Sequence, residues 1–130
     1  MTFQLTEPIL VIGLGGVGTR LAQKTKKSLN SDCLMISHDQ NDITAENSIK
    51  ISTKSVVNPS THLIRGSTLE TSDEIKKNIT NYSTIILMSN LAGKAGTGIG
   101  PIVSKICKQE QKNLLSFAVM PFKFEKERIF

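Results

Sequence analysis

The stretch "PILVIGLGGVGTR", residues 8–20, decides the fold of this chain, because an apolar strand meets a glycine-rich turn here. Its first part is a continuous apolar run that ends in Gly13, as in a central parallel strand buried on both faces. From Val17 to Leu29 the less polar positions recur every three to four residues, which predicts a helix with Arg20 on its polar side. Strand, glycine turn and helix in this order indicate the first unit of an α/β fold.

Strands and helices continue to alternate after this unit. Residues 53–68 are rich in Ser, Thr, Asn, Pro and Gly, which predicts an irregular connection. Thr71 and Glu74 match the capping-box pattern, which predicts that the next helix covers 72–82. The alternation predicts a doubly wound, mostly parallel α/β sheet with flanking helices. The other expected elements are strands at 32–37, 49–52, 84–89 and 114–119 and a helix at 98–112.

Length and composition limit the class of protein. A chain of 130 residues fits one compact domain, 1–130, in which about two thirds of the unfolded surface is buried. Hydrophobic residues make up 38% and charged residues 21%, as in ordinary globular proteins. The longest apolar runs are far shorter than the roughly 20 residues of a membrane helix, and the N-terminus lacks a signal-peptide pattern. We therefore expect a cytoplasmic protein.

The charged and reactive side chains narrow the choice of partners. The net charge of +5 favours anionic ligands, but the lysines are scattered and aromatic residues are few, so we expect no nucleic-acid surface. Cys33 and Cys107 lack the spacing of a metal or redox pair and are predicted to be core residues. His38 and His62 have no catalytic or metal-binding constellation around them, and are predicted to be surface or loop residues.

The first glycine turn, Gly13 to Gly18, matches the pattern G-x-G-x-x-G between a strand and a helix. Asp39 follows about 20 residues later at the end of the second predicted strand, where a dinucleotide-binding fold holds a ribose. Taken alone, the turn favours a Rossmann-type domain for NAD or FAD, or an adenylating domain for ATP. In another interpretation these glycines only tighten the corner between strand and helix.

A second glycine-rich turn, "AGKAGTG" at 92–98, follows the strand predicted at 84–89. A dinucleotide fold does not require it, and it is not a Walker A sequence, because Gly-Lys precedes the other glycines. In a doubly wound sheet ligands bind beyond the carboxyl ends of the strands, where both turns are expected. Backbone N–H groups and the positive ends of helix dipoles suit phosphate at such a position.

The two turns belong to a longer series of motifs. "GLGGVGTR" at 13–20, "SHDQN" at 37–41, "AGKAGTGIGP" at 92–101 and "PFKFE" at 121–125 stand in the order and at about the spacing of the FtsZ and tubulin family. Ala92 to Gly98 align without a gap with the glycine-rich signature of that family. The chain thus resembles the nucleotide-binding domain of an FtsZ-like cell-division GTPase over nearly its whole length.

The resemblance implies that both turns hold the phosphates of one GTP or GDP, with Mg²⁺. Asp39 would lie near the phosphates or the metal ion, Glu125 near the ribose, and Thr97 would donate its hydroxyl to a phosphate oxygen. Implied partners are the guanine nucleotide and another FtsZ-like subunit, or a second copy, bound head to tail. Membranes would be reached only through adaptors. The implied phosphate-binding residues are Gly15, Gly16, Val17, Gly18, Thr19, Arg20, Gly93, Lys94, Ala95, Gly96, Thr97 and Gly98.

The chain also departs from the family pattern. Ala92, Lys94 and Ala95 replace two glycines and a threonine of the signature. Lys94 is either a positive charge for phosphate or a solvated loop lysine, and Arg20 either reaches phosphate or covers the helix surface. The loop that activates water in FtsZ is not found among these residues, so no catalytic residue is assigned. We expect the N-terminal part of a longer chain or a reduced relative. A third possibility is a degenerate, non-hydrolysing regulator of an FtsZ filament.

Overall fold

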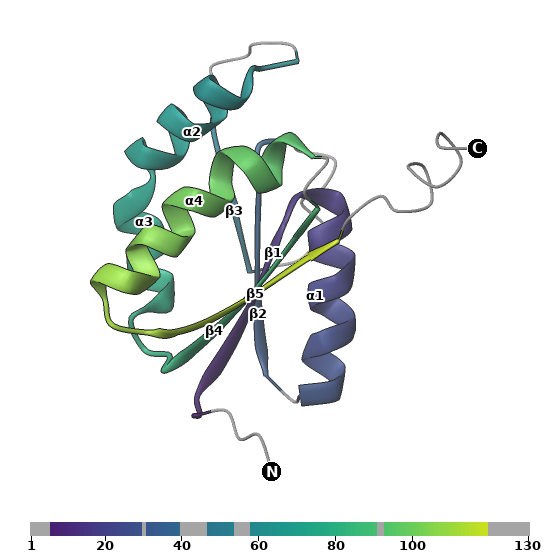
Figure 1. The fold of residues 1–130 in the computed structure, drawn as a ribbon, viewed down its shortest axis with the longest axis vertical. Coiled ribbons are helices and arrows are strands. Elements are labelled where there is room, and N and C mark those ends of the chain that lie inside the picture. The colour runs from purple at the N-terminus through teal and green to yellow at the C-terminus, as the bar shows by residue number, and fades with distance from the viewer. Residues whose placement is uncertain (1–5, 30, 40–46, 54–57, 91–92, 120–130) are drawn as a thin grey trace, which may run out of the picture.

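A computed structural model describes residues 6–29, 31–39, 47–53, 58–90 and 93–119 of the chain. Strands and helices alternate along these residues as the sequence predicts (Figure 1). The elements are β1 (Ile9–Leu14), α1 (Gly15–Leu29), β2 (Asp32–Ser37), β3 (Ser48–Lys50), α2 (Thr61–Glu70), α3 (Ser72–Ile79), β4 (Thr84–Asn90), α4 (Lys94–Gln109) and β5 (Asn113–Val119).

The described strands form one sheet in the order β3-β2-β1-β4-β5, and every pairing is parallel. All residues of the central strand β1 are buried, as its uninterrupted apolar sequence predicts. Chain order reverses beside β1, because β2 and β3 lie on one side of it and β4 and β5 on the other. This is the doubly wound arrangement, so the predicted fold class is confirmed.

Helices cover both faces of the sheet (Figure 1). Alternate side chains of β1 point to opposite faces. Ile9 and Val11 pack with Ala22 of α1 in a small cluster. Leu10 and Ile12 belong to the larger cluster on the other face, beneath α2, α3 and α4. The sheet is therefore packed between two apolar layers. The segments that lead from the strands into the helices lie at its carboxyl edge.

The cysteines are core or partly core residues. Cys107 is fully buried in α4, and burial raises the pKa of its thiol to about 11. Cys33 is half-buried against the α1-side cluster, and burial raises the pKa of its thiol as well. A thiol with a raised pKa is a poor nucleophile near neutral pH, which supports packing roles for both residues.

The prediction of an irregular connection over 53–68 is wrong for its second half, where α2 begins at Thr61. Ser60 caps this helix, since its Oγ accepts a hydrogen bond from the Leu63 N–H at 3.1 Å. Ile64 and Thr68 lie one turn apart on the buried face, and the Thr68 hydroxyl donates to the Ile64 carbonyl at 2.7 Å. The polar composition concealed this helix, because a buried threonine takes the place of an apolar residue.

The helix predicted at 72–82 exists but is shorter, and the structure contradicts its capping box. The Thr71 side chain makes no capping bond to α3, because its hydroxyl donates to the Ser67 carbonyl in α2 at 2.9 Å. Glu74 still lies in the first turn of α3, as predicted. The α3 helix ends at Ile79, where a turn leads into β4.

Both glycine-rich turns belong partly to helices. The α1 helix begins at Gly15, two residues before the predicted start, and α4 begins at Lys94, four residues before Gly98. The segments expected to be loops are therefore the first turns of two helices. Each first turn exposes N–H groups that have no partner within the helix, so these segments present backbone donors at the sheet edge.

A side chain from α2 compensates for Pro101, which lies inside α4. Pro101 has no N–H, so the carbonyl of Thr97 loses its usual helix partner. The Nη2 of Arg65 donates a hydrogen bond to this carbonyl at 3.0 Å. The bond fixes α2 against the N-terminal half of α4, beside the glycine-rich segment.

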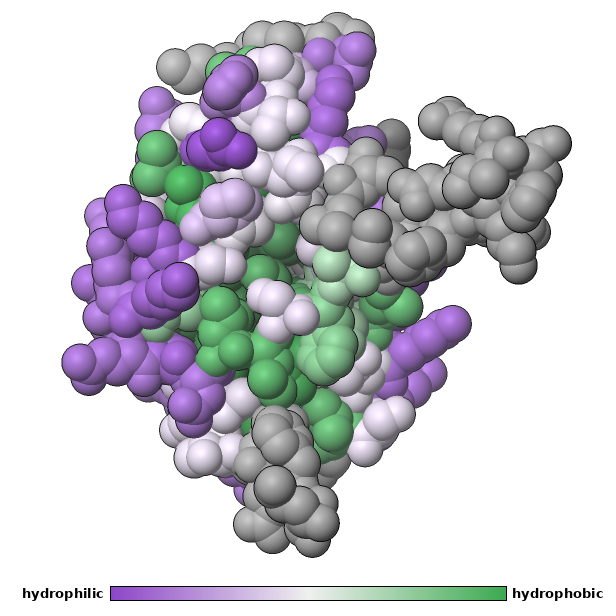
Figure 2. All heavy atoms as spheres, viewed as in Figure 1, coloured by the Kyte–Doolittle hydropathy of each residue, from purple (hydrophilic) through white to green (hydrophobic). Residues whose placement is uncertain are grey.

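The edge strand β5 carries apolar surface that the described residues leave uncovered. Phe117 exposes 54% of its surface, and hydrophobic side chains gather over this part of the molecule (Figure 2). A hollow of about 380 Å³ lies between α1, β4 and β5. Its wall consists of apolar residues of the two strands and a mixed set from α1, namely Ile86, Met88, Leu115 and Phe117 with Lys24, Thr25, Ser28 and Leu29. It lies on the α1 side of the sheet and away from both glycine-rich segments.

Candidate functional site

The first turns of α1 and α4 lie side by side at the carboxyl edge of the sheet (Figure 1). They follow β1 and β4, which are direct neighbours in the sheet. Gly15 has φ of +71°, a conformation that side chains with a Cβ rarely adopt. A Cβ atom built on Gly15 would lie 2.9 Å from the Cβ of Ala95. The two segments therefore meet, and glycine is required where they do.

A pocket of about 160 Å³ lies between these first turns. It brings together seven of the twelve residues that the sequence predicted for phosphate binding, and it adds three that were not predicted. The predicted residues in its wall are Gly15, Gly16, Val17, Gly93, Lys94, Ala95 and Gly96, and the further residues are Leu14, His38 and Asn90.

Charge in this pocket favours an anion. The first turns of α1 and α4 contain no acidic residue, so nothing within them neutralises the positive ends of their dipoles. Lys94 adds a positive side chain at the first position of α4. Converging N–H groups, two helix N-termini and one ammonium group are the features of a phosphate-binding pocket.

Lys94 makes contacts that neither sequence-based interpretation, a phosphate-binding charge or a solvated loop lysine, had proposed. Its Nζ donates hydrogen bonds to the Asn58 side-chain oxygen at 2.5 Å and to the Pro59 carbonyl at 2.9 Å. These residues directly precede Ser60, the cap of α2. Lys94 thus lines the pocket and also holds the start of α2 against the start of α4.

Other predicted phosphate-binding residues lie outside the wall of this pocket. Gly18 is buried, and a Cβ on it would overlap the Met88 carbonyl of β4. Gly98 packs against Ile64 of α2, and its added Cβ would lie 2.8 Å from the Ile64 Cγ2. Gly18 allows α1 to pack closely on β4, and Gly98 allows α4 to pack closely on α2.

Polar residues near the two turns have different surroundings. Thr19 is buried in α1, and its hydroxyl has no hydrogen-bond partner among the residues that the structure describes. Thr97 is exposed, and its hydroxyl donates within α4 to the Gly93 and Lys94 carbonyls, each at 3.3 Å. Arg20 is exposed and borders a separate hollow that is lined by residues of α1.

Two acidic residues complete the predicted set. Asp39 is exposed just beyond the end of β2, and its backbone N–H donates to the Ser37 Oγ at 3.1 Å. Glu125, like Ala92 and the "PFKFE" segment, lies outside the described residues. Within the part of the chain that the structure describes, no three His, Cys, Asp or Glu side chains gather as a metal site would require.

Sequence reasoning missed His38, which it placed among surface or loop residues. The structure places this histidine in the pocket wall, half-buried, directly after β2. Its Nδ1 atom is buried and has no hydrogen-bond partner among the described residues. A signal was present, because His38 immediately precedes Asp39 at the carboxyl end of the strand beside β1. The rule that selected Asp39 therefore applied to His38 as well.

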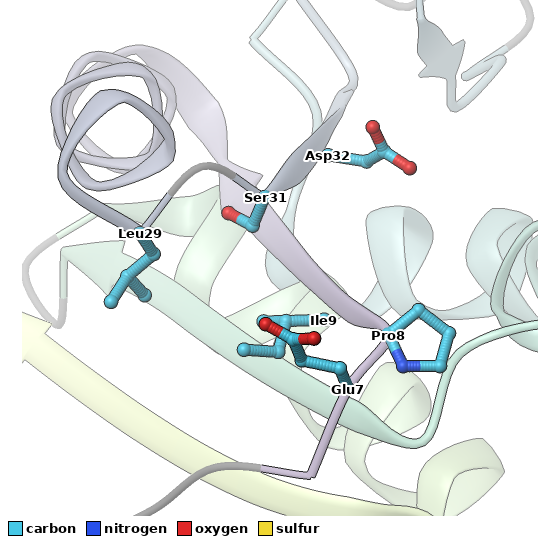
Figure 3. A pocket seen from close by; sticks show the side chains of 6 residues that line it. All are labelled: Glu7, Pro8, Ile9, Leu29, Ser31 and Asp32. Atoms are coloured by element: carbon cyan, nitrogen blue, oxygen red, sulfur yellow. The ribbon is translucent and has the colours of Figure 1, made fainter.

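A second hollow, of about 260 Å³, lies at the opposite end of the sheet (Figure 3). Among the described residues, its wall includes the carboxylates of Glu7 and Asp32 and no basic side chain. Asp32 already accepts a hydrogen bond from the hydroxyl of Tyr82 at 2.6 Å. Ligands of doubly wound sheets bind at the carboxyl edge, and two carboxylates disfavour an anion, so this hollow is not the candidate site.

Residues 8–129 match the model of the Tubulin/FtsZ family, GTPase domain. The chain belongs to the Tubulin/FtsZ family. The match includes both first turns and β2, so the pocket lies within the GTPase domain of this family. No match was found among curated protein sequences. Among the described helices, none combines the length and apolar character needed to cross a membrane.

Solved structures of FtsZ and TubZ share this fold. An empty FtsZ dimer from M. jannaschii has a TM-score of 0.75 and 22% identity, over 90% of this chain and 37% of that chain. A tail-truncated TubZ of Clostridium botulinum phage c-st has a TM-score of 0.71 and 17% identity, over 87% and 41%. A TubZ protofilament from Bacteriophage PhiKZ has a TM-score of 0.62 and 19% identity, over 85% and 37%. The chain spans less than half the length of each.

Proposed function

We propose that this Tubulin/FtsZ family domain binds GTP and GDP through the pocket between α1 and α4. The observation that carries the proposal is the contact between Gly15 and Ala95, because it joins two helix N-termini in one anion-binding pocket. Each N-terminus presents backbone donors from a different side. Together they suit a chain of phosphates better than one isolated charge.

The size of the pocket indicates which part of the nucleotide it receives. Pockets for whole small ligands usually enclose about 300–1,000 Å³, whereas this one encloses about 160 Å³. It therefore fits phosphate groups and leaves the ribose and base outside. We assign the pocket to the phosphates, with Glu125 proposed for the ribose as the resemblance implies.

Lys94 and Asp39 supply the charges in this proposal. An ammonium group has three N–H donors, and Lys94 uses two of them on Asn58 and Pro59, so one remains for a phosphate oxygen. Mg²⁺ in nucleotide sites is held mainly by phosphates and water with one or two carboxylates. Asp39, exposed beyond β2, is the carboxylate proposed for that role.

Hydrolysis in our proposal depends on a second subunit. The described wall of the pocket offers electrostatic stabilisation for phosphoryl transfer, and a neighbouring subunit would supply the group that activates water, as the family resemblance implies. The FtsZ dimer and the TubZ protofilament among the similar structures support self-association of this kind. We expect the isolated chain to bind nucleotide with very slow turnover.

Calorimetry on the 130-residue chain with GTP, GDP, ATP and NAD, each with Mg²⁺, tests the proposal. Guanine nucleotides should bind, and Lys94→Met should weaken GTP binding about tenfold through loss of a charge-assisted hydrogen bond. Lys112→Met is the matched control, since Lys112 bonds to the Thr80 carbonyl instead of lining the pocket. Preference for NAD or ATP would favour the dinucleotide or adenylating alternative, and no binding at all would favour a degenerate regulator.

A further inference from the structure

His38 approaches the proposed phosphate pocket from the β2 side. The other walls are formed by the first turns of α1 and α4 and the end of β4. Lys94 carries the positive charge among the described residues of the wall, and the amide side chain of Asn90 carries none. Asp39 is the next residue along the chain. The imidazole therefore stands beside a positively charged pocket whose other donors are backbone groups and one lysine.

The Nδ1 atom of His38 is buried without a hydrogen-bond partner among the described residues. Such an atom has lost its contact with water without gaining a hydrogen bond, which is unfavourable for the folded chain. Buried polar atoms in folded proteins are nearly always bonded, so an exception needs an explanation. A ligand atom that enters the adjoining pocket would provide one.

We propose that the Nδ1–H of His38 donates a hydrogen bond to a phosphate oxygen of the bound nucleotide. This inference rests on the proposed function and adds a third wall to the phosphate site. An anionic oxygen requires a donor, and an imidazole supplies one at Nδ1 either as that neutral tautomer or as imidazolium. His38 is then a binding residue that contacts the substrate, and not a surface histidine.

Two substitutions separate the donor from the bulk of the ring. His38→Asn keeps an amide N–H close to the position of Nδ1, and His38→Leu keeps a side chain of similar size without a donor. His62→Leu is the matched control, because His62 is exposed in α2 and outside the pocket wall. Each variant is first melted thermally, and its affinities for GDP and inorganic pyrophosphate are then measured by calorimetry.

The proposal predicts that His38→Leu weakens the binding of both GDP and pyrophosphate about tenfold or more. It predicts that His38→Asn and His62→Leu bind both ligands with affinities within about threefold of the parent. A threefold change is smaller than the loss of one hydrogen bond would cause. Nitrogen NMR gives an independent readout, since only two histidines are present. The His38 Nδ1 resonance should shift on addition of GDP, and the His62 resonances should not.

The possible failures can be told apart. GDP affinity unchanged in His38→Leu would overturn the role of His38 and leave the proposed function intact. Equal loss in His38→Asn and His38→Leu would also overturn it, because the donor alone would not restore binding. If the parent bound pyrophosphate through His38 but no GDP, the donor would stand and the nucleotide assignment would fail. If the parent bound neither, both proposals would fail.

Discussion

Gly15 and Ala95 stand so close that any side chain on Gly15 would press against the methyl group of Ala95, with the two Cβ atoms 2.9 Å apart. These residues lie 80 positions apart in the chain and belong to the first turns of different helices. Their contact makes one pocket out of two glycine-rich segments. The chain therefore needs both segments because neither encloses the pocket alone.

Gly15→Ala is expected to destabilise the fold by about 1–3 kcal/mol, because the left-handed φ of Gly15 is strained for alanine. It should also weaken GDP binding. Gly93→Ala is the matched control in the same pocket, since its added Cβ would come no closer than 3.5 Å to another residue. Urea unfolding and calorimetry measure both effects. Adding Ala95→Gly to Gly15→Ala should recover only part of the stability, since the contact is relieved and the φ strain stays; full recovery would contradict this account.

Arg65 and Pro101 should be energetically coupled. Arg65→Met removes the donor to the Thr97 carbonyl and is expected to cost about 1–2 kcal/mol of unfolding free energy. In a Pro101→Ala background the restored N–H can bond to this carbonyl, so the same change should cost much less. A double-mutant cycle by urea unfolding measures the coupling, and equal costs in both backgrounds would show that Arg65 acts in another way.

Gly66→Ala should stabilise the chain. Gly66 lies within α2, and a Cβ on it would meet nothing within 4 Å. Alanine in a helix interior is favoured over glycine by about 0.5–1 kcal/mol. Thermal and urea unfolding should therefore show a gain of this size with GDP affinity unchanged. A loss of stability would mean that α2 is not helical at this position in solution.

Tyr82 provides a pH-dependent probe of the fold, since it is the only tyrosine and the chain has no tryptophan. Its hydrogen bond to Asp32 is the main cause that raises the pKa of the phenol from 10.0 to about 12. Because the folded-state pKa is the higher one, the stability this bond contributes is complete below about pH 10. It is lost as the pH rises from there to about 12.

Phenolate absorbance measures this titration directly. Asp32→Asn should lower the phenol pKa towards 10.0, because the charged acceptor is lost. Asp73→Asn removes an equal charge from the surface of α3 and serves as the control. If both variants titrated as the parent does, Asp32 would not be the cause of the shift.

The sheet was predictable from sequence because its strands are short apolar runs bounded by glycine or polar residues. Residues 32–37 were predicted with the observed bounds, and 84–89 within one residue. The α2 helix was missed because Ser67 and Thr68 are buried there in place of apolar residues, and the Thr68 hydroxyl is satisfied by the Ile64 carbonyl. Periodicity of apolar residues cannot reveal such a face.

The candidate site was predictable in outline only. Glycine spacing located both first turns, but the sequence could not separate a wall glycine with open surroundings, such as Gly93, from Gly18 and Gly98, which permit close packing. It could not show that Lys94 reaches Asn58, because that contact joins residues 36 positions apart. His38 was missed because the rule for ligands at the carboxyl end of the sheet was applied to Asp39 and not to the residue before it.

The most direct test of the central claim is an amide NMR titration of the 130-residue chain with GDP and Mg²⁺. If α1 and α4 form one phosphate site, the backbone amides of Gly15 to Val17 and of Gly93 to Thr97 should shift together and follow a single binding curve. Amides near the hollow at Glu7 and Asp32 should stay unchanged. Shifts confined to Gly15 to Val17, or two separate binding curves, would contradict the claim that both segments hold the same nucleotide.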